Sequence, residues 1–206
     1  MATDIRLEFN TLKILKKREK WQLYFLVETS NPTDDTQNVY TVMPGQHPIS
    51  LTKDSDNVVQ FKPEGENTEG MFILERAIPA SGSISVNVYL MQSRSKLRNS
   101  GEKMDELTSA AKGESAAAKI VKTLGKSTPW IAVASTAGNA IGKILSDVKD
   151  RQLGFLSLSE DFQDDKAGDN NRKNKFSTGF AELDWTWSLK WLPQKQQQPQ
   201  IHQDSH

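Results

Sequence analysis

The sequence contains no cysteine. Disulfide bridges, thiolate nucleophiles and cysteine-based zinc sites are therefore excluded for this chain. Histidine is also scarce, because His202 and His206 lie in the last few residues and only His47 precedes them. A serine–histidine pair would have to use His47, and the chain has no Gly-x-Ser-x-Gly motif. From these residues we expect a protein that is not an enzyme and has no cofactor.

Excess charge of either sign is also lacking, since 26 Lys and Arg balance 26 Asp and Glu in 206 residues. This balance disfavours nucleic acid as a partner, because released counterions supply most of that affinity. The first residues have no basic stretch followed by an apolar run, so we expect no signal peptide and a cytoplasmic location. Export by a leaderless route stays open. No small-molecule substrate is evident, and the oligomeric state is not encoded in any pattern.

Alternating apolar and polar residues recur along the chain, which is typical of strands with one buried face. Ile5, Leu7 and Phe9 open the first run, and a change of phase near Thr11 indicates a β-bulge. The last run has its large residues on one face: Leu183, Trp185, Trp187, Leu189 and Trp191. These runs predict a mainly β fold, a single antiparallel β-sandwich of about eight strands over residues 1–193. The Gln-rich tail, residues 194–206, is predicted to be disordered.

Residues 97–150 differ from the rest in their richness in Ala, Lys and Glu. Helical spacing of apolar residues predicts an α-helical insertion here, placed before the last two strands. One predicted helix covers Glu114 to Leu124, and another begins near Pro129. The second would carry a stripe at helical spacing: Trp130, Ala134, Ala137, Ile141, Leu145 and Val148.

Two segments carry a resemblance to a known family. Lys149 to Leu158 places an acidic turn before a Leu-Gly pair and an alternating strand, and Ile84 to Leu90 is a second alternating strand. Both are similar to strands of the calcium/lipid-binding β-sandwich module named from conserved region two of protein kinase C. The resemblance implies a lipid- or partner-binding end formed by three loops: Ser30–Asn38, Lys62–Glu69 and Gln92–Arg151.

That family holds calcium with carboxylates on its third loop, because Ca²⁺ prefers six to eight oxygen ligands. The matching stretch here carries cations instead, at Arg94 and Lys96. The resemblance therefore implies a calcium-independent member without a metal. Arg94, Lys96 and Arg98 are candidates to contact phosphate or a partner's carboxylates, with solvated charges as the alternative. Trp130 and Ile141 of the insertion are the apolar candidates for the same partner- or lipid-binding surface.

A separate calcium candidate rests on Asp54 and Asp56, whose spacing occurs in calcium loops. Asp161 and Asp164 would join them if both segments lay at the same end of the fold. The alternative is that these residues mark turns, where Asp is common.

Two functions follow as hypotheses. The first is a binding module that presents its helical insertion to a protein partner or, as a membrane-associated domain, to a membrane surface. The alternative is a leaderless effector, toxin or secretion-system cargo whose helical hairpin, residues 116–148, acts on a membrane. The stretch from Ser127 to Gly142 has no charged residue. It is shorter than the approximately twenty apolar residues of a membrane span.

Overall fold

The fold comes from a computed structural model that describes the following residues: 4–16, 20–31, 34–44, 48–62, 70–79, 81–94, 119–123, 130–135, 150–162 and 170–190. This part of the chain forms thirteen strands in two antiparallel sheets and contains no helix. The predicted mainly β, antiparallel class is therefore confirmed. The tail, residues 194–206, lies outside the described residues.

The smaller sheet has five strands in the order β12-β13-β1-β5, with β6 also paired to β1. Their bounds are β1 (Asp4–Ile14), β5 (Val58–Gln60), β6 (Met71–Ala77), β12 (Asn170–Lys175) and β13 (Ala181–Lys190). β1 pairs with β13 in a register that shifts between Phe9 and Thr11, so Asn10 is the extra residue of a β-bulge. The predicted bulge is thus confirmed.

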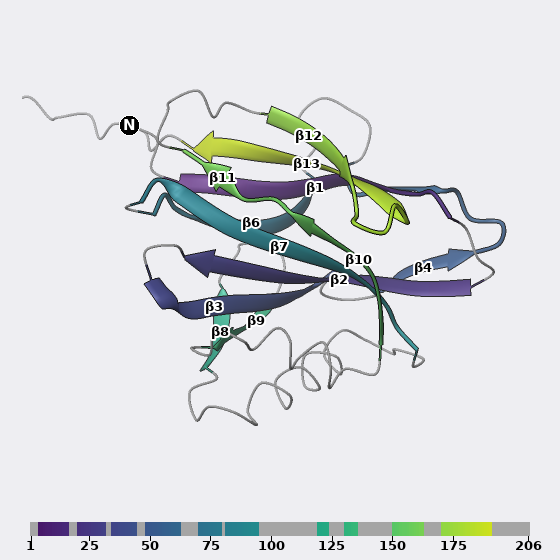
Figure 1. Cartoon of the computed structure of the whole chain (residues 1–206), viewed down its shortest axis with the longest axis horizontal. Helices are drawn as coiled ribbons and strands as arrows, with labels where there is room; N and C mark the ends of the chain where they lie inside the picture. The colour runs from purple at the N-terminus through teal and green to yellow at the C-terminus, as the bar shows by residue number, and fades with distance from the viewer. Residues whose placement is uncertain are drawn as a thin grey trace, which may run out of the picture.

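The larger sheet has eight strands in the order β10-β7-β2-β3-β9-β8, with β11 paired to β7 and β4 to β2. Their bounds are β2 (Lys20–Asn31), β3 (Asp34–Met43), β4 (Ile49–Thr52), β7 (Ser83–Gln92), β8 (Lys119–Thr123), β9 (Trp130–Ser135), β10 (Arg151–Ser157) and β11 (Glu160–Asp161). Figure 1 shows β12, β13 and β1 along one side of the molecule and β2 and β3 along the other.

One hydrophobic core joins the two sheets in a sandwich-like arrangement. The ring of Phe9 on β1 meets that of Phe25 on β2 edge to face, with centroids 5.2 Å apart. Trp21 stacks on Phe180 near one end of the sheets, at 4.4 Å. On β13 the alternation places Trp185 and Trp187 inward, both at most 5% exposed. The large residues predicted to share one face of this strand thus include two core indoles, and Trp191 lies outside the described residues.

The helical prediction is wrong for two segments of the insertion. Lys119–Thr123 and Trp130–Ser135 are the paired strands β8 and β9, not parts of helices. Short β-branched runs in both segments suit a pleated strand, and pairing with β3 outweighs the helical propensity of nearby Ala and Lys. Trp130 and Ala134 therefore lie on a strand. The other residues of 97–149 lie outside the described residues.

The strand count and order also differ from the prediction. Four strands, β10 to β13, follow the insertion in place of two. The segment from Glu160 to Lys175 is rich in charged residues and still forms β11 and β12 at its two ends. β12 has a sequence of low strand propensity, Asn170 to Lys175, and forms by pairing along β13.

Two predicted binding loops lie at opposite ends of the larger sheet. β2 and β7 run antiparallel, with Ser30 opposite Ser85 and Leu23 opposite Gln92. The chain therefore leaves β7 at the end where β2 begins, whereas the turn after Ser30 lies at the other end. The expectation that both loops share one end is wrong, because successive strands of this chain do not simply alternate in direction.

Candidate binding surfaces

The ends of the insertion are tied together by one carboxylate. Asp150 Oδ1 accepts a hydrogen bond from the backbone N–H of Arg94 at 2.9 Å. Its Oδ2 accepts one from the Tyr24 hydroxyl at 2.8 Å. The backbone N–H of Ser93 also donates to the carbonyl oxygen of Gln22. The end of β7 and the start of β10 thus meet at one point, which is held by charge-assisted hydrogen bonds.

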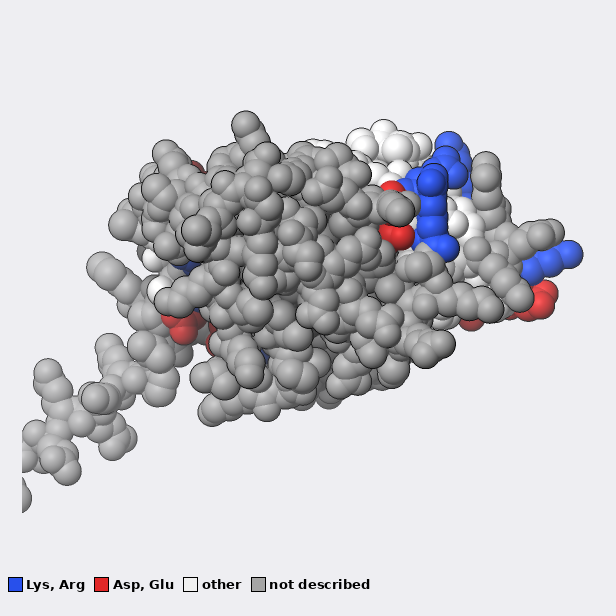
Figure 2. Space-filling model, turned by 90° about the horizontal axis from the view of Figure 1, so that it is seen from below, with Lys and Arg blue, Asp and Glu red and all other residues white. Residues whose placement is uncertain are grey.

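Charged side chains accompany this point on the surface. The side chain of Arg94 is exposed, and Arg151 follows Asp150 directly, also exposed. Figure 2 shows blue and red side chains side by side toward the right-hand end of the view. At this point itself Arg94 and Arg151 flank Asp150, so basic and acidic groups are mixed.

β8 and β9 carry the larger sheet beyond β3. β9 pairs with β3 from Asn38 opposite Ser135 to Thr41 opposite Ala132. β8 pairs with β9 along its whole length, from Lys119 to Thr123. Among the residues that the structure describes, β8 pairs with β9 alone, so it is an edge strand of the larger sheet. Edge strands offer backbone N–H and C=O groups to an incoming strand.

The β10 edge is closed by its own chain. The backbone N–H of Ser177 donates to the carbonyl oxygen of Phe155 at 2.9 Å, and its hydroxyl accepts from the Phe155 N–H at 3.1 Å. The Thr178 hydroxyl donates to the carbonyl oxygen of Leu153. The outward backbone groups of Phe155 and the carbonyl of Leu153, at the centre of this strand, are therefore already used.

Other described edges carry the features that discourage pairing. β4, β5 and β11 have four, three and two residues. β12 is dense in charge, and its Arg172 forms an ion pair with Glu160. β6 has an irregular register at Ile73 and carries Glu75 and Arg76 beyond it. Short length, charge and bulges usually protect an edge strand from pairing with another chain. β8 differs from these strands because it is five residues long and has Ile and Val at its centre.

The outer face of the larger sheet contains a buried carboxylate. Glu28 is 5% exposed, and three neighbours donate to it. The Tyr40 hydroxyl lies 3.1 Å from Oε1, the Asn87 amide 3.1 Å from Oε2 and the Tyr89 hydroxyl 3.4 Å from Oε2. The charge is satisfied by hydrogen bonds within the sheet, as a buried carboxylate requires. This network is a structural feature, because its polar atoms are engaged with one another.

Burial raises the pKa of the Tyr89 phenol to about 12, and the charge and hydrogen bond of Glu28 add to the rise. The unfolded chain has the ordinary tyrosine pKa near 10. The protonated Tyr89 phenol therefore contributes its full stabilisation of the folded state below about pH 10, and this contribution is lost as the pH rises toward 12. We expect the free energy of unfolding to fall by on the order of 1 kcal/mol between about pH 9 and about pH 11.

Urea denaturation at the two pH values, with wild type and Tyr89→Phe side by side, measures this effect. The variant lacks the ionisable hydroxyl but keeps the ring that packs on Phe155. Its stability should decline less over the same interval. An equal decline of the free energy of unfolding in both proteins would show that other groups cause the loss of stability at high pH.

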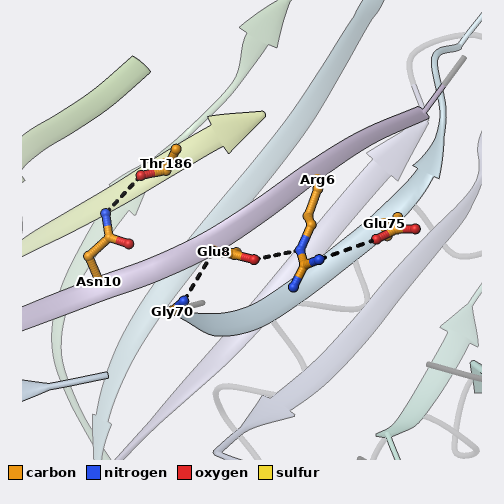
Figure 3. Close-up of polar contacts among 6 residues, drawn as sticks. All are labelled: Arg6, Glu8, Asn10, Gly70, Glu75 and Thr186. Atoms are coloured by element: carbon orange, nitrogen blue, oxygen red, sulfur yellow. Dashed lines mark hydrogen bonds and ion pairs between the residues drawn. The ribbon is translucent and has the colours of Figure 1, made fainter. Parts of the chain in front are cut away.

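The outer face of the smaller sheet carries a row of charges (Figure 3). Arg6 Nε lies 2.5 Å from a carboxylate oxygen of Glu8, and Arg6 Nη1 lies 3.9 Å from Glu75. The other oxygen of Glu8 accepts from the backbone N–H of Gly70 at 3.1 Å. The Arg6 guanidinium also lies over the ring of Phe72, 5.2 Å from its centroid. These contacts join β1 to β6.

Two of the five predicted binding residues lie in the part of the chain that the structure describes. Arg94 is exposed beside the start of the insertion, and Trp130 opens β9. Lys96, Arg98 and Ile141 lie outside the described residues. The edge of β8 was missed, because its sequence was assigned to a helix.

The calcium candidates are separated. Asp54 and Asp56 are exposed in the turn before β5, near the end of β7 marked by Gln92, because β4 pairs with the beginning of β2. Asp161 pairs with Ser83 at the beginning of β7. Ten residues of strand separate these ends, about 30 Å. The expectation that they share one end is therefore wrong, and Asp164 lies outside the described residues. Within the described residues, no three His, Cys, Asp or Glu side chains gather to hold a metal.

No protein-family model matches this sequence, and no curated protein is similar to it. The described residues include no helix with the length and apolarity needed to cross a membrane. The function has to be inferred from the chain's own surfaces.

Proposed function

We propose that this protein is a non-enzymatic binding module that takes up an extended segment of a protein partner by strand addition at β8. One observation carries the proposal: β8 ends the larger sheet with one side unpaired by any described strand. Among the described edges it combines five residues of length with a β-branched centre. Strand addition uses main-chain hydrogen bonds for affinity and alternate side chains for specificity.

The support for β8 is continuous with the core. β9 joins it to β3, β3 pairs with β2 over most of its length, and β2 contributes Phe25 and Val27 to the core. An incoming strand would thus add to a sheet that is already anchored. Pre-organised backbone groups lower the entropy cost of binding an extended peptide.

The composition of β8 favours an acidic partner. Its sequence, Lys-Ile-Val-Lys-Thr, has two lysines and no acid. Opposite charges on neighbouring strands stabilise a pair by about 0.2–1 kcal/mol, and like charges destabilise it. Lys119 and Lys122 are three positions apart, and the period of two puts these positions on opposite faces. The partner segment therefore carries Asp or Glu opposite these two positions and β-branched residues between them. Backbone pairing needs no metal, so binding is calcium-independent, as the resemblance to the calcium/lipid-binding module implied.

A membrane surface is the competing ligand. The hairpin expected over residues 116–148 would need helix at 119–123 and 130–135, where the structure has β8 and β9. The remaining choice is between an extended peptide and a lipid headgroup, and the same lysines would serve either. The two ligands differ in what they require, because only the peptide pairs with the backbone of β8.

Fluorescence anisotropy with labelled peptides tests the proposal. Two peptides share the same Val and Thr positions, and carry either Glu or Lys opposite Lys119 and Lys122. We expect the Glu peptide to bind and the Lys peptide to bind about tenfold more weakly, since two cross-strand charge pairs change sign. Vesicles with and without anionic lipid are the second arm. Binding to anionic vesicles without binding of either peptide would overturn strand addition.

A further inference from the structure

The larger sheet is apolar on both of its faces. One face, which carries Phe25 and Val27 of β2, packs against the smaller sheet in the shared core. Six further apolar side chains of β2, β3 and β7 lie outside that core: Tyr24, Leu26, Tyr40, Val42, Tyr89 and Met91. They alternate with core residues along their strands, so they belong to the outer face of the sheet, which also carries Glu28.

This outer face is buried within a single chain. Each of the six side chains is at most 9% exposed, and Glu28 is 5% exposed. The described strands all belong to the two sheets, and the smaller sheet lies against the other face. The cover of the outer face therefore comes from a part of this chain outside the described residues.

The register of the strands shows which part of the chain has to cross this face. β9 ends at Ser135, beside the end of β2 marked by Ser30. β10 begins after Asp150, beside the end of β2 marked by Leu23. Four strand spacings separate β9 from β10 in the sheet. With about 3.3 Å per residue and about 4.8 Å per strand, the two points are about 30 Å apart along a diagonal of the sheet.

Residues 136–149 join these two points. Fully extended, this connection reaches about 50 Å, so it has little length for a detour. The core fills the inner face, which leaves the outer face as the path. The connection 95–118 runs between the same two ends of the sheet and reaches about 85 Å. Its greater length allows other paths, so the shorter connection is the one tied to this face.

We propose that residues 136–149 dock on the outer face of the larger sheet and form a third layer of the fold. Ile141, Leu145 and Val148 of this segment have helical spacing, and would give an apolar stripe to match the apolar face. The segment is also anchored on this face, because the Tyr24 hydroxyl donates to Asp150 Oδ2 at 2.8 Å. Docking uses the face of the sheet and not the edge of β8, so it stands independently of strand addition.

Thiol labelling of the full chain tests the docking, because the chain has no cysteine of its own. Val42→Cys places a thiol on the outer face, and Val27→Cys places the same group in the shared core. Both thiols should react at least about 100-fold more slowly than in urea. Adding Leu145→Asp should speed the labelling of Val42→Cys at least about tenfold, because the layer does not bury a charge, and leave Val27→Cys unchanged. Ser146→Asp adds the same charge outside the stripe and should change neither rate.

Three results would overturn the proposal. Fast labelling of Val42→Cys without Leu145→Asp would show an open face, left for a second copy or another protein to cover. Unchanged protection of Val42→Cys after Leu145→Asp would show that another segment is the cover. If Leu145→Asp unfolds the chain, Leu145→Ala takes its place, with an expected rise of at least about fivefold for Val42→Cys. An equal rise for both thiols in Leu145→Ala would place Leu145 in the shared core and contradict docking on the outer face.

Discussion

Replacing Trp187 with Ala should lower the free energy of unfolding by about 3–5 kcal/mol, the usual cost of truncating a large core aromatic. The side chain is 2% exposed. Its ring meets Phe162 edge to face at 5.4 Å, and its Nε1 donates to the carbonyl oxygen of Leu158 at 3.1 Å. The substitution leaves a cavity between β13 and the segment after β10, and leaves that buried carbonyl without its donor. A loss of this size is a large fraction of the total stability of about 5–15 kcal/mol.

Two further variants divide this loss into its parts. Trp187→Phe keeps an aromatic ring but removes the indole N–H, so it should cost less than the alanine. Ser188→Ala, at the next position on the outer face, should change stability by no more than about 0.5 kcal/mol. Urea denaturation followed by far-UV circular dichroism measures all three. A loss below about 1 kcal/mol for Trp187→Ala would show that the two sheets do not share this core.

Proline in β8 should weaken binding of the Glu peptide by about 30-fold or more. In an antiparallel strand, the backbone groups of one residue point to one neighbour and those of the next residue point to the other side. Ile120 and Val121 lie opposite Val133 and Ala132 of β9. Of the two variants Ile120→Pro and Val121→Pro, one therefore removes an N–H that faces β9, and the other removes an N–H that faces the outer edge. Two lost strand-to-strand hydrogen bonds cost about 2 kcal/mol.

The adjacent pair of variants supplies its own control. The proline that faces outward should leave the free protein as stable as wild type and still lose the peptide. The proline that faces β9 should also lower stability or expose the amides of β9 to exchange. If both variants bind the Glu peptide as wild type does, the peptide uses another surface.

Much of the fold could be predicted from alternation alone. β1, the first half of β7 and β13 each bury one face through a clear period of two, and the phase change after Phe9 indicated the bulge that the register shows. The tryptophans of β13 could be assigned to the core on the same ground. These signals are local, because a strand with one buried face has to alternate wherever it pairs.

The remainder depends on contacts between distant segments. Lys119–Thr123 sits in a region whose Ala, Lys and Glu content favours helix, and its strand forms through β9 and β3. Asn170–Lys175 has almost no apolar residue, and pairing with β13 defines it. Propensity is a weak guide when a neighbouring strand supplies the hydrogen bonds.

The candidate surfaces were harder still to predict. Arg94 was correctly placed at the exit from β7, but the role of Asp150 in holding that exit needs Tyr24, 126 residues away in sequence. The outer face of β2 gave one signal, Tyr24 and Leu26 at the positions between core residues. The segment proposed to cover it could be found only from the register.

Hydrogen exchange on β8 tests strand addition most directly. With the Glu peptide present, we expect the alternate amides of residues 119–123 that face away from β9 to become protected, because they donate to the peptide backbone. Those facing β9 should change little, since they are already paired. Protection confined to another strand, or bound peptide with no change in β8, would contradict strand addition at this edge.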